Sequence, residues 1–305
     1  MNIAKPSGHL LEIYMPYLYD EPRMLDVAMR ETEDGFYQNI EIGICFDGKN
    51  QASMRRFLES NALTATTFAA PYLNKAGLNL SSTDKSIRRK AINAVKDLSS
   101  YAADCGYMNL GVSSGNDVPE PEREKTLLEF AEALIEIAEH QRKLGMFMTL
   151  EPLDRFAFKK KLVGEISETV QWFPTVKKAC PNAFLHWDSA HEILNDADLF
   201  SSLDASAPYL AHVHLCNVIL DKKHPCYGDL HMDCGTAPDF ATEGFLSAAY
   251  GGDMIRKVEA FTLPEGIKKI NVSLEVLGHP GDDLVLKAHN AKEFLKECFR
   301  LAEEV

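Results

Sequence analysis

The feature that most constrains the fold is a regular alternation of short β-rich runs with longer helical segments along the whole chain. Eight runs have the composition of strands: 9–14, 37–44, 62–69, 107–112, 146–151, 183–188, 210–215 and 270–276. Helical periodicity is clearest from Thr126 to Gln141, where apolar residues recur on one face. Alternation predicts a parallel sheet, and eight repeats favour closure into a (β/α)8 (TIM) barrel. No linker interrupts the pattern, so we expect a single α/β domain over residues 1–305.

Several polar residues stand where helices should begin. Ser82 and Asp84 can cap a helix that runs to about Ala103, and Asp282 or Asp283 can cap the last helix.

Composition narrows the class of protein. Hydrophobic residues make up 46% of the 305 residues, enough to bury a sizeable core, and the net charge is −13. A negative field repels phosphate backbones, so we expect no nucleic-acid partner. No apolar run reaches the length of a membrane span, and the N-terminus lacks the pattern of a secretory signal, so we expect no membrane association. The seven cysteines show no CxxC pairing and are expected to be reduced thiols in a cytoplasmic protein.

Four strands carry an ionisable residue at their carboxyl end. Glu151, Asp188, His214 and Glu275 close the runs MFMTLE, AFLHWD, AHVH and INVSLE. Since strand side chains alternate, these residues should face inward while Leu150, Trp187, Val213 and Leu274 face the helices. The carboxyl ends of barrel strands meet at the face where active sites of this fold lie.

This set of residues predicts a metal site. Three carboxylates and an imidazole cannot share a small volume unless their pKa values shift or a cation joins them. An oxygen-rich set with one nitrogen suits Mn²⁺, Mg²⁺ or Co²⁺, with Zn²⁺ as an alternative. Any one member alone would be explained as a helix cap, an ion-pair partner or a core histidine, but four at corresponding strand ends favour a joint site.

Histidines are concentrated between positions 186 and 231, which contain six of the ten. His191 follows Asp188 by three residues and can reach a ligand above the metal. His186 and His212 lie deeper, where a supporting or core role and a direct role are equally compatible with the pattern. A long insertion near 217–250 should build the mouth of the active site. It holds His224, Pro225, Tyr227, Gly228, Asp229, His231, Asp233 and Gly235.

At these residues the chain resembles the xylose-isomerase-like barrel superfamily, which includes sugar isomerases and epimerases and endonuclease IV. The matching pieces are Leu150-Glu-Pro, Asp188-Ser-Ala-His191, His212-Val-His214-Leu and Ser273-Leu-Glu275. The resemblance implies one divalent ion held by Glu151, Asp188, His214 and Glu275. It also implies that Glu151 and Glu275 form the acid–base pair and that His191 contacts substrate oxygens.

Some positions depart from the family pattern. Ketose 3-epimerases usually place an arginine six residues after the metal-binding histidine, where this chain has Leu220, and Asn217 is a candidate for its substrate contact. Endonuclease IV carries extra histidines on its second and third strands, where this chain has Thr67 and Phe68 or Ser113 and Ser114. Asp229-Leu-His231 resembles an Asp-Arg-His segment of that nuclease and predicts a loop contact to substrate or metal. Because the extra histidines are missing from the second and third strands and the chain is acidic, we do not expect a nuclease of the endonuclease IV kind.

The chemistry expected of such a site is proton transfer next to a carbonyl. A metal chelated by a carbonyl and a neighbouring hydroxyl stabilises an enediolate, and carboxylates remove and return the proton. We expect an isomerase or epimerase of an unphosphorylated sugar, ketose or polyol derivative. The alternatives are a lyase or dehydratase (or a C-glycoside deglycosidase subunit, which would need a partner subunit), and a sugar-binding barrel without turnover. Similar barrels commonly form homo-oligomers, dimers or tetramers.

Overall fold

Eight parallel strands close into a barrel in the computed structural model, which describes residues 3–234 and 244–304. The order around the barrel is β1 to β7 in sequence, then β9, which pairs with β1 and closes the ring. The barrel strands are β1 (Ala4–His9), β2 (Asn39–Glu41), β3 (Thr64–Phe68), β4 (Asn109–Ser113), β5 (Phe147–Glu151), β6 (Ala183–Asp188), β7 (Leu210–Ile219) and β9 (Ile270–Glu275). The predicted (β/α)8 barrel is confirmed.

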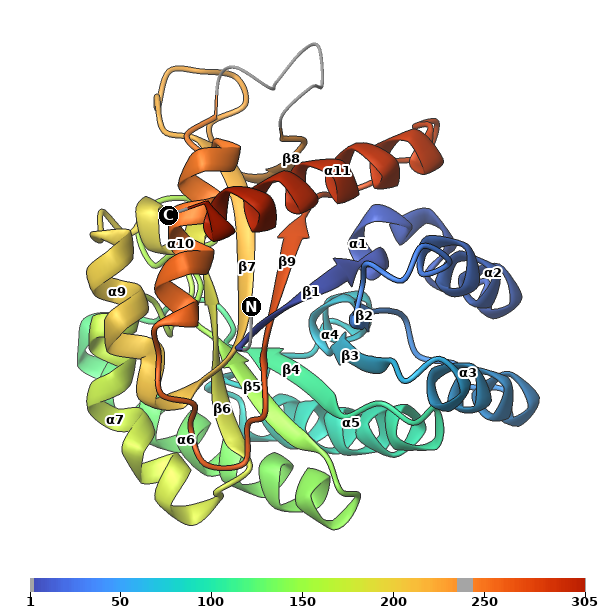
Figure 1. Cartoon of the computed structure of the whole chain (residues 1–305). Coiled ribbons are helices and arrows are strands. Elements are labelled where there is room, and N and C mark those ends of the chain that lie inside the picture. Colours follow the sequence, from blue (N-terminus) through green and yellow to red (C-terminus); the bar gives the residue numbers. More distant parts are fainter. Residues whose placement is uncertain (1–2, 235–243, 305) are drawn as a thin grey trace.

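Helices surround the strands, as Figure 1 shows. They are α1 (Leu10–Ile13), α2 (Glu21–Glu31), α3 (Gly48–Ser60), α4 (Ala70–Ala76), α5 (Lys85–Asp104), α6 (Glu120–Lys143), α7 (Ile166–Ala179), α8 (Ser189–Leu194), α9 (Leu199–Ser206), α10 (Ala248–Glu259) and α11 (Leu284–Glu303), with short 3-10 turns at Met15–Tyr17 and Ala207–Tyr209. Among the described residues, no helix is both long and apolar enough to cross a membrane. All seven cysteines are free thiols.

The predicted helix starts are borne out in detail. Asp84 caps α5, where one carboxylate oxygen accepts the backbone N–H groups of Ser86 and Ile87 at 2.7 and 3.3 Å. Asp283, rather than Asp282, caps α11. Both cases follow from the unpaired N–H groups that every helix exposes in its first turn.

The first strand was predicted in the wrong place. Residues 10–13 of the predicted strand 9–14 form α1, and β1 instead spans Ala4–His9 with Pro6, Ser7 and Gly8 at its centre. Pro6 and Gly8 have low intrinsic strand propensity, but pairing with β2 and β9 on both sides overrides it.

The insertion after β7 adds a strand that the sequence reading did not predict. β7 continues to Ile219, and β8 (Gly228–Met232) pairs with it antiparallel. Gly235, the last residue named in the insertion, lies outside the described residues. The hairpin of β7 and β8 places Asp229 and His231 in the lining of the cavity described below.

Phe68 forms the packed centre of the barrel beneath the mouth. Its ring centroid lies 5.5 to 5.9 Å from the rings of His9, His186, His212 and His214. Room for the ring comes from Gly111 on the neighbouring strand β4, where a Cβ would lie 2.6 Å from Phe68 Cδ1. The glycine is therefore required by space.

We predict that Gly111→Ala destabilises the protein by about 1–3 kcal/mol, because an added methyl group overpacks the barrel interior. Urea unfolding measures the loss. The matched control is Gly48→Ala at the start of α3, where the nearest atom to an added Cβ is 3.9 Å away. The control should change the free energy of unfolding by no more than about 0.5 kcal/mol. Equal stability of the two variants would contradict this account of Phe68.

Candidate metal centre

Four side chains converge at the carboxyl ends of β5, β6, β7 and β9. Glu151, Asp188, His214 and Glu275 each offer one ligand atom, and these atoms all lie within 4.8 Å of one another. His214 Nδ1 lies 3.4 Å from Glu275 Oε2 and 3.9 Å from both Glu151 Oε1 and Asp188 Oδ2. Nδ1 of His214 thus faces three carboxylates. The separations leave room for an ion between this nitrogen and the carboxylate oxygens.

Three atoms at this centre have no hydrogen-bond partner among the described residues. They are Asp188 Oδ2, His214 Nδ1 and Glu275 Oε2, and all three are buried. Buried polar atoms without partners are rare, because each one forfeits its hydrogen bonds to water. One divalent cation between them would satisfy all three at once. The residues therefore fit an ion of the Mn²⁺, Mg²⁺ or Co²⁺ kind.

Asp188 divides its two oxygens between two tasks. Oδ1 accepts the backbone N–H groups of Ala190 and His191 at 2.7 and 3.0 Å and so caps α8. Oδ2 is left free and faces His214. The helix cap, which would explain a lone aspartate here, thus orients the carboxylate toward the centre.

The charges at the centre shift one another's pKa values. Burial, followed by repulsion from Glu275, raises the pKa of Glu151 to about 8. Burial likewise raises the pKa of Asp188 to about 7. Burial also acts on Glu275, but His231 and His214 outweigh it and hold the pKa of Glu275 well below its usual value. The three carboxylates together behave as a set that cannot all ionise cheaply without a cation.

A cavity of about 1120 Å³ opens above these residues. Its walls include Phe68, Ser113, Glu151, His191, His214, Asp229, His231 and Glu275. A volume of this order accommodates a monosaccharide-sized ligand and its water.

The predicted contacts His191, Asp229 and His231 meet in this cavity. Asp229 is buried, and its Oδ2 lies 2.9 Å from His231 Nε2, 3.0 Å from Lys159 Nζ and 3.8 Å from His191 Nε2. His231 also reaches Glu12 Oε2 at 2.6 Å through Nδ1. The Asp229 carboxylate therefore lies beside Lys159, His191 and His231, and all four residues line the cavity.

Asn217 is not brought to this wall. Its carboxamide accepts the backbone N–H of Leu246 at 3.1 Å and donates to the carbonyl of Asp233 at 3.3 Å. It lies three positions after His214 along β7, so strand alternation places it on the opposite face. Its bonds tie the described ends of the insertion to the strand.

The structure adds residues that the sequence analysis did not name as site residues. They are His9 at the end of β1, Glu12 in α1, and Glu41 at the end of β2. Asp154 Oδ2 lies 3.4 Å from His191 Nδ1. The one sequence signal for Glu41 is its charge within the apolar run Ile40-Glu41-Ile42. A buried strand with a single carboxylate indicates an inward-facing functional group.

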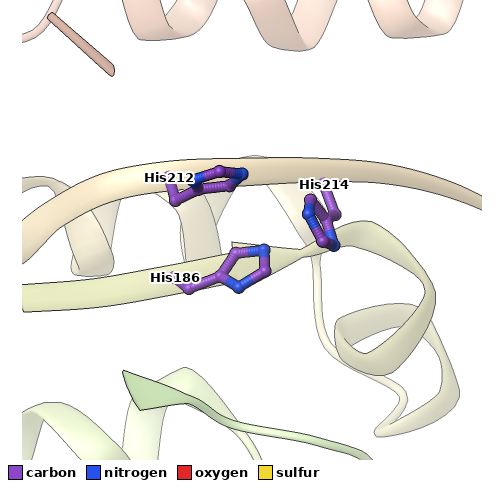
Figure 2. A group of neighbouring side chains, drawn as sticks. All are labelled: His186, His212 and His214. Atoms are coloured by element: carbon purple, nitrogen blue, oxygen red, sulfur yellow. The ribbon is translucent and has the colours of Figure 1, made fainter. Parts of the chain in front are cut away.

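His186 and His212 lie next to His214 (Figure 2). The His186 ring centroid is 4.6 Å from that of His212 and 4.0 Å from that of His214. Neither ring nitrogen of His186 has a hydrogen-bond partner in the part of the chain that the structure describes, and burial lowers the pKa of His186 well below the ordinary value. A neutral His186 thus packs against His214 without adding charge to the centre.

Comparison with known proteins identifies the family and the fold. A family model described as a xylose isomerase-like TIM barrel matches residues 36–260. No curated protein sequence matches the chain. A structure titled L-ribulose 3-epimerase is 17% identical with a TM-score of 0.67, and the match covers 99% of this chain and 95% of that one.

Two further solved structures have the same fold. D-psicose 3-epimerase from Clostridium cellulolyticum H10 is 16% identical with a TM-score of 0.58, covering 99% of this chain and 96% of that one. A protein titled AP endonuclease, family 2, from Brucella melitensis is 17% identical with a TM-score of 0.64, covering 97% and 99%.

We predict that Asp188→Asn removes metal binding and leaves the fold intact. Asparagine still caps α8 through its carbonyl oxygen, but an NH₂ group replaces the free oxygen. Metal affinity, measured by calorimetry with Mn²⁺, should fall by more than about 100-fold. Loss of a residue that only bonds to a metal ligand typically costs about 10–100-fold. The control is Asp198→Asn, which keeps an equivalent exposed cap on α9. Equal affinity of both variants would exclude Asp188 as a ligand.

Metal binding should release protons. Because Glu151 and Asp188, with pKa values of about 8 and 7, must lose their protons to bind a cation, affinity should rise from pH 6 to pH 8.5. The rise is up to about tenfold per pH unit for each proton displaced. Calorimetric titration with Mn²⁺ in two buffers of different ionisation enthalpy counts the protons. A flat affinity without proton release would contradict these pKa directions.

Proposed function

Since the chain belongs to the xylose isomerase-like TIM barrel family, we propose that it is a divalent-metal-dependent isomerase or epimerase of a sugar, ketose or polyol derivative. The observation that carries the proposal is the group of three unpartnered, buried atoms of Asp188, His214 and Glu275. Two of these residues, His214 and Glu275, line a cavity that is large enough for a monosaccharide. Glu151, Asp188, His214 and Glu275 are the proposed ligands.

A divalent ion bound there would stabilise the negative charge that develops on a substrate carbonyl oxygen when the neighbouring carbon loses its proton. The proton carriers are Glu151 and Glu275. They come from β5 and β9, which are not neighbours in the barrel, and so approach the centre from different sides. Removal on one face and return on the other inverts a carbon, and return to the adjacent carbon isomerises the sugar.

Side chains around the pair have positioning roles. His9 Nε2 and His231 Nδ1 lie 3.4 and 3.5 Å from Glu275 Oε1, which turns the other oxygen toward the centre. His191 Nε2 lies 3.8 Å from Asp229 Oδ2 and can offer an N–H group to a substrate hydroxyl. His231 is already bonded through both ring nitrogens, to Asp229 and Glu12, and so serves to hold these carboxylates in place. Donors such as His191 discriminate strongly against analogues that lack the hydroxyl, because their own hydrogen bonds would be lost.

The substrate class rests on two independent supports. The solved structures titled as 3-epimerases of ribulose and psicose share the whole fold, although at 16–17% identity. The cavity wall presents hydrogen-bonding groups in place of an extended basic surface, which favours a polyhydroxylated small molecule over a nucleic acid.

We predict solvent exchange at a carbinol carbon. Incubation of the Mn²⁺-loaded protein with ketoses, aldoses and inososes in D₂O should place deuterium next to the carbonyl, detected by NMR. Glu151→Gln and Glu275→Gln should each slow exchange by about 10²–10⁴-fold, because each removes a proton carrier. Glu136→Gln, a change of the same kind on the outer face of α6, serves as the control.

The product distinguishes the remaining chemistry. Loss of a substituent from the substrate would replace the isomerase proposal by a lyase. Binding of sugars by the metal-loaded protein without any exchange would indicate a binding barrel and contradict the proposed catalysis.

A further inference from the structure

Glu41 places a carboxylate inside the barrel, outside the group of proposed metal ligands. It comes from β2, it is fully buried, and its two oxygens are shared among four side chains. Oε1 accepts the hydroxyl of Ser7 at 2.6 Å and lies 2.9 Å from His212 Nε2. Oε2 lies 2.8 Å from His214 Nε2 and 3.1 Å from His9 Nδ1. Glu41 therefore contacts residues of β1 and β7 at once.

A contact from β2 to β7 crosses the barrel interior, because β1 and β9 separate these strands around the ring. Glu41 reaches across the interior to make it. A fully buried carboxylate is costly to desolvate, and a hydrophobic side chain of the same size would often stabilise such a site as well or better. A purely structural role therefore does not explain the charge.

His214 has only one nitrogen left for the centre. Its Nε2 meets Glu41, and Nδ1 is the unpartnered atom that faces the three carboxylates. The ring is also held by packing, since its centroid lies 4.7 Å from that of His9 and 4.0 Å from that of His186. A metal can bind only after His214 has lost its second proton. An N–H at Nε2 that donates to Glu41 then leaves the lone pair on Nδ1, which is the form that binds a metal.

We propose that Glu41 is the positioning residue of the metal centre: by accepting the Nε2 proton of His214 it sets the tautomer and the orientation in which Nδ1 binds a divalent cation. The inference rests on the proposed function for the presence of the ion. It concerns a residue that does not itself touch the ion or the substrate.

Glu41 is itself held in place. Its Oε1 is anchored by Ser7 and His212, and His212 Nδ1 lies 3.3 Å from Asn271 Nδ2. A chain of contacts therefore runs from Asn271 on β9 through His212 and Glu41 to His214. Rotation of the Glu41 carboxylate would break the contacts with both histidines, so its orientation is strongly determined.

Substitution by glutamine separates charge from shape. Glutamine has one acceptor oxygen and one NH₂ group, so it cannot accept an N–H from both His212 and His214. If the NH₂ group faces His214, Nε2 must become the acceptor and the proton moves to Nδ1, where it blocks the metal. If the oxygen faces His214, the contact survives but His212 must change its tautomer and the bond loses its charge.

The test compares Glu41→Gln with Glu31→Gln. Glu31 is also a buried glutamate, but it bonds Tyr14 and Arg30 away from the centre, so it controls for loss of a buried charge. Mn²⁺ affinity by calorimetry should fall about 10–100-fold in Glu41→Gln and stay unchanged in Glu31→Gln. Nitrogen-15 NMR of histidine-labelled, Zn²⁺-loaded protein should show a protonated Nε2 on His214 in the wild type and its loss or altered exchange in Glu41→Gln.

Equal Mn²⁺ affinity of Glu41→Gln and wild type, with the His214 signals unchanged, would overturn the inference and leave the metal centre standing. Failure of the wild type to bind Mn²⁺ would overturn the proposed function, and this inference with it. If Glu41→Gln does not fold, Glu41→Asp replaces it. That variant keeps the charge but is shorter by one methylene, and it should lower Mn²⁺ affinity in the same way. Wild-type affinity in Glu41→Asp would count against the inference.

Discussion

Repulsion among three crowded carboxylates, two buried and one partly buried, is the constraint around which this barrel is organised. Glu151, Asp188 and Glu275 lie close enough that burial and mutual repulsion raise two of their pKa values, while nearby imidazoles lower the third. A protein interior tolerates such crowding only with compensation. Here compensation comes partly from His214 and His231, and the atoms left without partners indicate the remainder, which a divalent cation would supply. The cavity, the hairpin over it and the network beneath it all surround this point.

The barrel interior below these carboxylates is polar, as the burial of their charges requires. Inward-facing side chains below the centre bond to one another, as in the pairs Asn109–Thr149 at 3.1 Å and Asn39–Ser7 at 2.9 Å. The apolar residues that alternate with them, such as Trp187 and Val213, pack outward against the helices. Stability therefore comes from the layer between strands and helices. The inside of the barrel is left free to hold charged groups in fixed positions, which is what a preorganised site requires.

Sequence reasoning recovered the parts that obey local periodicity. The repeat of strands and helices predicted the barrel, and the strand-end positions of Glu151, Asp188, His214 and Glu275 predicted their convergence, which the structure shows. It failed where tertiary pairing overrides local preference, as for β1 through Pro6 and Gly8. A substrate contact was predicted for Asn217, but its odd spacing from His214 already places its side chain on the opposite face of β7. β8 and the cross-barrel contact of Glu41 depend on which distant segments meet, and no local pattern carries that information.

The position of Glu41 shows how the fold and the proposed chemistry depend on each other. The four proposed ligands come from residues 151–275, whereas Glu41, Ser7 and His9 come from the first 41 residues. Closure of the barrel through the pairing of β1 with β9 is what brings these two groups together. An imidazole whose orientation depends on a carboxylate from β2 can have its binding geometry only after the ring of strands has closed. The ability to bind a cation at this centre is therefore a property of the complete barrel, and no half of it contains a competent site.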